Sequence, residues 1–133
     1  MLPDWVSKYI GIPYIPKGRT ASGLDCYGLA IHVLKFEGNI ILKDELKYPA
    51  TADFSKEAEI AIKSHLESYW NEVESPELFD IAIFKIHGIK SHIGIMIDHL
   101  HFLHTYQGAD SNLGRIDDKN WAKRLHGYFR INR

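Results

Sequence analysis

The spacing of apolar residues predicts a helix in the first third of the chain. Between residues 26 and 36, apolar side chains recur at intervals of three and four positions, which places them on one face of a helix. Asp25 is a residue type favoured just before a helix, and the Gly38-Asn39 pair is typical of a helix end. The pattern therefore predicts a helix that begins at Cys26.

Two further helices are predicted on either side of this one. Pro3 suits the first turn of a short N-terminal helix, which Gly11 is expected to end. Asp53 or Ser55 is expected to open a later helix, whose apolar side continues to Leu66 among lysine and glutamate residues. The first half of the chain is thus predicted to be mainly helical.

The pattern changes from helical to strand-like after Pro76. Four segments rich in apolar and β-branched residues predict strands, and one segment between them predicts a helical turn. The strands are residues 79–86, 92–97, 101–106 and 125–131, and the turn is residues 118–124. Helices followed by strands favour an α+β fold in which N-terminal helices pack on a C-terminal antiparallel sheet.

Composition limits the classes of protein that the chain can belong to. Its 133 residues fit a single domain, residues 1–133, and 45% of them are hydrophobic. A formal net charge of −1 offers no general basic field for nucleic acid. No run reaches the roughly 18 apolar residues of a membrane span. The N-terminus lacks a signal-peptide pattern, so we expect synthesis in the cytoplasm.

Cys26 is the first candidate for chemistry. It is the only cysteine of the chain, so it is either a small buried apolar residue or a nucleophile. Its position directly after a helix N-cap places the sulfur near free backbone N–H groups and a partial positive charge. Both favour a thiolate, so we expect the pKa of this thiol to be lowered.

His92 and His104 are candidates for the base that a cysteine nucleophile needs. Strand alternation places His92 opposite the isoleucine face of its strand. A three-residue hairpin loop at residues 98–100 would set Gly94 opposite His104, leaving room for an imidazole beside His92. The second imidazole can then orient the first, as the third member of a catalytic triad does.

A zinc site is the competing interpretation of the histidines. His99, His101 and His104 form an H-x-H-x-x-H cluster, which Cys26 can join as a thiolate ligand. The spacing matches no standard zinc motif, and the chain supplies a single soft ligand. We therefore expect no metal and no other cofactor.

The loop before Cys26 offers residues for substrate binding. Tyr14 lies twelve positions before the cysteine, and its hydroxyl can reach the thiol pocket. Asp25 is first a helix cap and second a substrate contact. Lys17 and Arg19 can meet a substrate carboxylate, although the pattern favours a solvated basic loop for each of them.

Four short motifs together resemble the NlpC-type family of cell-wall cysteine peptidases. They are, in chain order, Y-I-G-I-P-Y, G-L-D-C-Y-G-L, S-H-I-G-I-M-I and F-L-H-T, and the resemblance extends from about Trp5 to the final strand. It implies a papain-like fold with Cys26 as nucleophile, His92 as base and His104 as the orienting residue. It also implies that Tyr14 lies near the oxyanion site.

Two features resemble phage tail-tip members. Tyr27 stands where a serine usually follows the nucleophile in the family, and residues 121–130 read W-A-K-R-L-H-G-Y-F-R. The resemblance implies a peptidase that cuts peptidoglycan stem peptides between D-glutamate and a diamino acid, carried in a virion beside other tail proteins. An inactive structural tail protein of the same fold is the alternative.

Overall fold

The computed structural model describes residues 2–42 and 56–132. Its helical elements are η1 (Asp4–Tyr9), α1 (Cys26–Gly38), α2 (Lys56–Tyr69) and α3 (Lys119–Ala122). Its strands are β1 (Arg19–Thr20), β2 (Gly23–Leu24), β3 (Trp70–Val73), β4 (Ile81–Ile86), β5 (Ile89–Met96), β6 (His101–Tyr106), β7 (Ala109–Arg115) and β8 (Leu125–Ile131). The residues expected to open the third helix, Asp53 and Ser55, lie outside the described residues.

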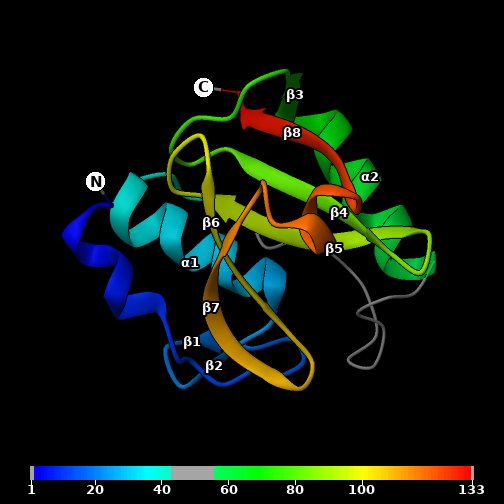
Figure 1. The fold of residues 1–133 in the computed structure, drawn as a ribbon. Coiled ribbons are helices and arrows are strands. Elements are labelled where there is room, and N and C mark those ends of the chain that lie inside the picture. Colours follow the sequence, from blue (N-terminus) through cyan, green and yellow to red (C-terminus); the bar gives the residue numbers. More distant parts are fainter. Residues whose placement is uncertain (1, 43–55, 133) are drawn as a thin grey trace.

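A six-stranded antiparallel sheet forms the centre of the fold. Its strand order is β3-β8-β4-β5-β6-β7, and the helices α1 and α2 lie against it (Figure 1). The predicted α+β arrangement of N-terminal helices on a C-terminal antiparallel sheet is therefore confirmed. The first helix differs from the prediction, because Asp4–Tyr9 is a 3-10 helix.

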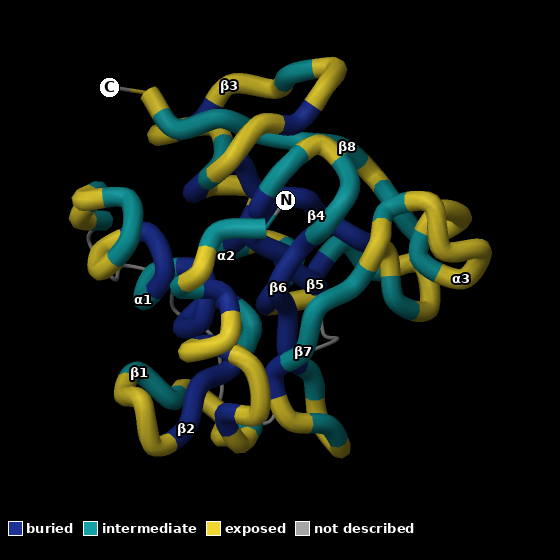
Figure 2. The backbone as a smooth tube through the Cα atoms, turned by 60° about the vertical axis from the view of Figure 1, so that its left-hand side comes forward, coloured by how far each residue is buried: buried dark blue, intermediate teal, exposed yellow. Residues whose placement is uncertain are grey.

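The sheet has an apolar cluster on each face because side chains alternate along its strands. Toward α1 and α2, the larger cluster joins helix residues such as Val33 and Ile62 to the isoleucines of β4 and β5. On the other face, a smaller cluster contains Phe84 and Phe102, with Trp121 packed against it. Figure 2 shows the buried strands between α1 on one side and α3 on the other.

The start of α1 is fixed by its cap and by close packing of the preceding loop. The side chain of Asp25 accepts a hydrogen bond from the Gly28 N–H at 2.7 Å, as a helix N-cap does. A Cβ at Gly28 would lie 2.2 Å from the Gly18 carbonyl oxygen, which explains the glycine. The helix ends at Asn39, whose backbone is left-handed, as the Gly-Asn pair predicts.

Four strands were not predicted: β3 and β7 of the six-stranded sheet, and β1 and β2, which pair with each other. β3 follows α2 directly, and only Trp70 of its four residues is buried. β7 is an edge strand with the sequence A-D-S-N-L-G-R, which contains no β-branched or aromatic residue. The two-residue strands β1 and β2 lie inside the segment expected to be a loop.

Candidate active site

Cys26 lies at the N-terminus of α1, against a bulge in β5. The pairing of β4 with β5 steps from Phe84–His92 to Lys85–Lys90, so Ser91 is the extra residue. The Cys26 Sγ contacts the Ser91 carbonyl oxygen at 3.9 Å, and the residue as a whole is half-buried. The bulge therefore brings the backbone directly before His92 to the sulfur.

The pKa of the Cys26 thiol is raised, which corrects the expectation from the helix start. Burial, followed by the negative charge of Asp25, raises this pKa to about 12. The backbone N–H groups of Ile93 and Tyr27 and the charge of Arg19 act in the opposite direction but do not prevail. At neutral pH the resting cysteine is thus a thiol, and a base must remove its proton.

His92 and His104 meet as the hairpin prediction requires. The pairs Ile95–Leu103 and Met96–Phe102 have the expected register, and His92 Nε2 lies 2.9 Å from His104 Nδ1. One detail of the prediction was wrong. The space above Gly94 is filled by the Phe102 ring, 2.7 Å from where a Cβ would stand, and not by an imidazole.

Asn112 on β7 extends this pair into a chain of three side chains. Its Oδ1 lies 3.1 Å from His104 Nε2, while its Nδ2 donates to the Asp110 carbonyl oxygen at 3.0 Å. The amide oxygen therefore faces His104, whose Nε2 must carry a proton to donate. His104 Nδ1 then accepts from His92 Nε2–H, which leaves His92 Nδ1 as the basic nitrogen.

Both imidazoles are buried and neutral at physiological pH. Each is 1% exposed. Burial is the main cause that lowers the pKa of His92 well below its ordinary value, with contributions from His104 and Arg124. Burial also lowers the pKa of His104 to about 4, against an opposing hydrogen bond from Asn112. The neutral state is the one that can accept a proton from a thiol.

The two histidine rings contact each other directly, and the thiol contacts β5, the strand that carries His92. The Cys26 sulfur is adjacent to the backbone of Ser91 and Ile93, the residues on either side of His92. Among the described residues, no hydrogen bond joins the sulfur to the His92 ring. Catalytic hydrogen bonds are commonly long in ligand-free enzymes and tighten with substrate bound.

Asp25 and Arg19 form a structural network at the start of α1. The carboxylate of Asp25 is buried and accepts from the Gly28 N–H at 2.7 Å, from Arg19 Nη1 at 2.8 Å and from the Lys17 N–H at 3.2 Å. The Arg19 guanidinium also lies 5.5 Å from the centre of the Tyr27 ring. Asp25 therefore acts as the predicted cap, with both oxygens engaged by protein groups.

Tyr14 lines a groove that is open to solvent. The groove has a volume of about 530 Å³ and lies between the Pro13–Pro16 segment and the turn formed by residues 107–110. The Tyr14 hydroxyl is buried and has no hydrogen-bond partner within residues 2–42 and 56–132. An unpartnered hydroxyl is costly unless a ligand or water satisfies it, which suits a substrate-binding group.

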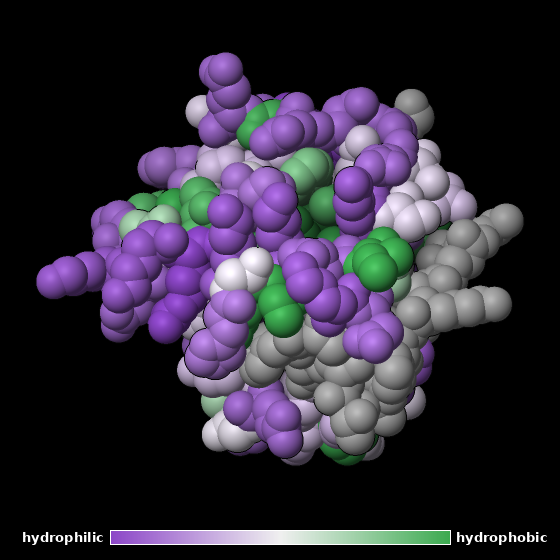
Figure 3. All heavy atoms as spheres, turned by 90° about the vertical axis from the view of Figure 1, so that its right-hand side faces the viewer, coloured by the Kyte–Doolittle hydropathy of each residue, from purple (hydrophilic) through white to green (hydrophobic). Residues whose placement is uncertain are grey.

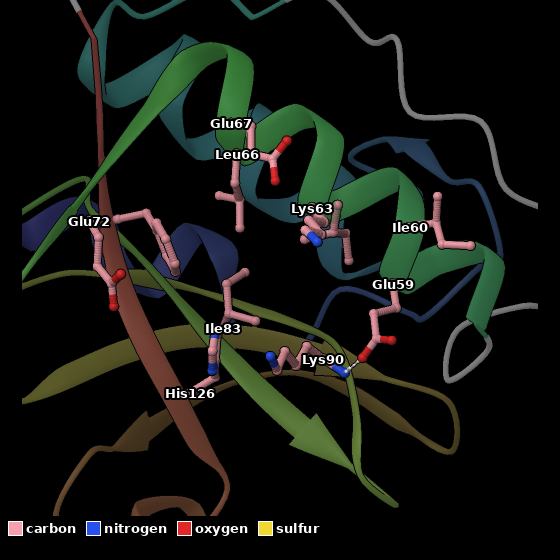
Figure 4. Close-up of a pocket in the computed structure, with 11 residues that line it drawn as sticks. Glu59, Ile60, Lys63, Leu66, Glu67, Glu72, Ile83, Lys90 and His126 are labelled. Atoms are coloured by element: carbon pink, nitrogen blue, oxygen red, sulfur yellow. Dashed lines mark hydrogen bonds between the residues drawn. The ribbon is translucent and has the colours of Figure 1, made fainter.

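A second pocket lies away from the candidate residues. It has a volume of about 440 Å³ between α2 and the sheet, and its floor is apolar while lysine and glutamate side chains rim it (Figure 4). Cys26, His92 and His104 line neither this pocket nor the groove at Tyr14. The described atoms of the face drawn in Figure 3 are mainly hydrophilic, with hydrophobic atoms in small separate groups.

The histidines proposed as zinc ligands do not converge. His101 Nδ1 pairs with Asp98 at 3.0 Å, while His104 points to the other face of β6 and contacts His92. Among the described residues, no group of three or more His, Cys, Asp or Glu side chains is placed to hold a metal ion. These positions therefore do not form the zinc site of the alternative interpretation.

A family model identifies the chain. The NlpC/P60 family model matches residues 11–130, so the protein belongs to the NlpC/P60 family. This family consists of cysteine peptidases that act as peptidoglycan hydrolases, and it has the papain-like fold that the four motifs implied. No curated protein is significantly similar to the chain. No helix in the described part is long and apolar enough to cross a bilayer.

Solved structures of NlpC/P60 proteins share this fold. One is an NLP/P60 family protein from Staphylococcus aureus described as similar to lipoprotein, with 19% identity and a TM-score of 0.64 over 95% of this chain. The NlpC/p60 domain of the peptidoglycan hydrolase SagA has 18% identity and a TM-score of 0.57 over 96% of this chain and 92% of its own. A Bacillus cereus family protein has 15% identity and a TM-score of 0.55 over 98% of this chain. The chain spans only 38% of the first structure and 41% of the third.

Proposed function

We propose that the protein is a cysteine peptidase that hydrolyses an amide bond in the stem peptides of peptidoglycan. In this proposal Cys26 is the nucleophile, His92 the general base and His104 the residue that orients it. The observation that supports it most is the chain formed by the buried His92 and His104 with the partly exposed Asn112. It leaves one basic nitrogen on a strand whose backbone contacts the thiol.

The first half of the reaction forms an acyl-enzyme. His92 Nδ1 takes the proton of the Cys26 thiol as the sulfur attacks the carbonyl carbon, and a C–S bond forms while the carbonyl oxygen becomes an oxyanion. The backbone N–H of Cys26, which lies in the first turn of α1, and the Tyr14 hydroxyl are the proposed oxyanion donors. When the C–N bond breaks, His92 gives its proton to the leaving amine.

The second half releases the acid product. His92 Nδ1 takes a proton from water while the water oxygen attacks the thioester carbon. When the C–S bond breaks, His92 returns the proton to sulfur, so the thiol and the neutral imidazole are both regenerated. No cofactor or metal takes part in these steps.

The finer specificity is proposed from the family resemblance. The substrate is a stem peptide cut between D-glutamate and a diamino acid, which lies in the groove lined by Tyr14. Tyr27 and the W-A-K-R-L-H-G-Y-F-R ending support association with a phage tail, where the enzyme would open the wall locally or act in assembly. The domain, residues 1–133, is proposed to be a single unit.

Digestion of defined muropeptides tests the activity. The wild-type protein is expected to produce fragments cut within the stem peptide, detected by mass spectrometry, and Cys26→Ala is expected to produce none. Circular dichroism establishes that the variant is folded. Cleavage that persists in Cys26→Ala would rule out the proposed nucleophile.

An inactive structural protein of the same fold is the second candidate. It is favoured by the raised pKa of the Cys26 thiol and by the lack of a hydrogen bond to His92 among the described residues. Labelling with iodoacetamide separates the two candidates. The peptidase is expected to lose Cys26 labelling when muropeptide occupies the site, whereas an inert protein would show the same slow labelling with and without muropeptide.

A further inference from the structure

We propose that Trp121 is a positioning residue for the catalytic base, because its indole covers the His92–His104 pair and holds both rings in place away from water. The proposal rests on the function proposed above, since it assigns a role relative to His92. It goes beyond that function by adding a residue from α3, an element that contributes no member of the proposed triad.

The indole contacts both imidazoles at once. Its ring centre lies 5.3 Å from that of His92 with an angle of 23° between the planes, so the two rings are stacked. It lies 4.7 Å from the centre of His104 at 85°, an edge-to-face contact. The indole therefore packs against both rings of the hydrogen-bonded pair. It belongs to α3, which lies across the strands from α1 (Figure 2).

Neighbouring residues fix the indole in this position. On its inner side, it meets Phe84 edge-to-face at 5.2 Å and Phe102 at 5.9 Å. The Asp118 side chain caps α3 by accepting from the backbone N–H of Trp121 at 3.3 Å. The helix is thus anchored at its start, and the ring is packed against a part of the sheet that is itself buried.

A cation lies on the indole as well. The Arg124 guanidinium carbon is 5.4 Å from the Trp121 ring centre, within the range of a cation–π contact. The positive charge of Arg124 also disfavours protonation of His92. Trp121 therefore helps to keep the imidazole neutral in two ways, by excluding water and by holding a cation near the ring.

The ionisable groups around His92 come from three elements. His104 and Tyr106 belong to β6, with ring centres 5.1 Å and 5.9 Å from that of His92. Arg124 follows α3, and the Cys26 thiol belongs to α1, next to the strand that carries His92. Replacing the indole removes none of these groups, and any change of background at Cys26 is shared by the variants compared, so the replacement tests the covering ring itself.

The test is a titration of the imidazoles by NMR in three variants. Trp121→Leu and Trp121→Phe are made in a Cys26→Ala background, with Trp5→Leu as control, because Trp5 stacks on Phe79 in a different part of the molecule. Trp121→Leu is expected to raise the titration midpoint of His92 by about one pH unit or more, because water regains access to the ring. Trp121→Phe keeps an aromatic cover and is expected to raise it less, and Trp5→Leu is expected to leave it unchanged.

Kinetics with the intact cysteine give the second readout. Trp121→Leu is expected to lower kcat about tenfold or more at neutral pH with KM changed less than threefold, and to move the acidic limb of the kcat/KM profile to higher pH. Unchanged midpoints in both Trp121 variants, with folding preserved, would overturn the proposal. If the wild-type protein cuts no muropeptide, the proposed function fails, while the titration still decides whether Trp121 controls the histidines. If Trp121→Leu does not fold, the titration of Trp121→Phe decides whether Trp121 controls the histidines.

Discussion

At the scale of single residues, Asn112 decides which nitrogen of the candidate base is free. Its amide is oriented by the bond from Nδ2 to the Asp110 carbonyl, so its oxygen must accept from His104. The proton positions on both imidazoles follow from that one orientation. In the proposed mechanism, a side chain that does not contact the thiol thus sets the direction of proton transfer.

Replacing Asn112 with alanine is expected to lower kcat by about tenfold to a hundredfold, because His104 and His92 lose their fixed tautomers. KM is expected to change little, since Asn112 does not line the groove at Tyr14. Steady-state kinetics on a muropeptide measure both. Asn112→Asp is the matched control, since it keeps an acceptor oxygen and should retain more activity than the alanine variant. Full kcat in Asn112→Ala would contradict the tautomer argument.

At the scale of elements, the start of α1 combines a helix cap with a buried ion pair. Asp25 is 1% exposed and holds the Gly28 N–H, Arg19 and the Lys17 N–H. Placing a thiol at a helix start usually favours the thiolate, yet the negative charge of the same cap and burial outweigh that effect. The helix start therefore holds Cys26 in position but does not lower the pKa of its thiol.

Asp25→Ala is expected to lower the free energy of unfolding by about 2 kcal/mol, because it removes the cap and the partner of the Arg19 charge. Asp25→Asn is the matched control. It keeps an oxygen that can cap the helix, so its expected loss is about 1 kcal/mol or less. Urea denaturation of the three proteins measures the difference. Equal stability of the wild type and Asp25→Ala would show that the network contributes nothing.

The sequence predicted the helices and strands in which apolar residues recur at regular spacing. It did not predict the strands that lack such a pattern. The two histidines were predicted to meet because the isoleucines between His92 and Ile97 fix the face, and a short hairpin fixes the register. Asn112 was not predicted because it lies on an edge strand of small and polar residues, which shows no strand pattern. Trp121 lies in the segment 118–124 that was expected to form a helical turn. Its contact with His92 depends on α3 folding back over the sheet, which local pattern does not encode.

At the scale of the whole molecule, stability is coupled to pH through the buried histidines. The folded-state pKa of His104, about 4, is below the ordinary value of 6.5, so the unfolded chain binds a proton first as the pH falls. The stability from the neutral ring is fully present above pH 6.5 and is lost as the pH falls from 6.5 toward 4. A difference of this size corresponds to about 3 kcal/mol.

Urea denaturation at pH 7.5 and pH 4.5 is expected to show this loss. His104→Asn removes the titrating ring, so its free energy of unfolding should fall less between the two pH values than that of the wild type. The comparison separates the histidine from the carboxylates, which both proteins share. Identical losses in the two proteins would mean that His104 is not held neutral by the fold.

The central claim is that the Cys26 sulfur becomes acylated by a stem peptide. The most direct measurement is rapid acid quenching of the wild-type protein with a muropeptide, followed by mass spectrometry of the intact protein and of its peptides. We expect an added mass equal to the acyl part of the substrate, located on the peptide that contains Cys26, and a much smaller amount in His92→Ala. Substrate cleavage with no adduct at Cys26, or with an adduct on another residue, would contradict the account.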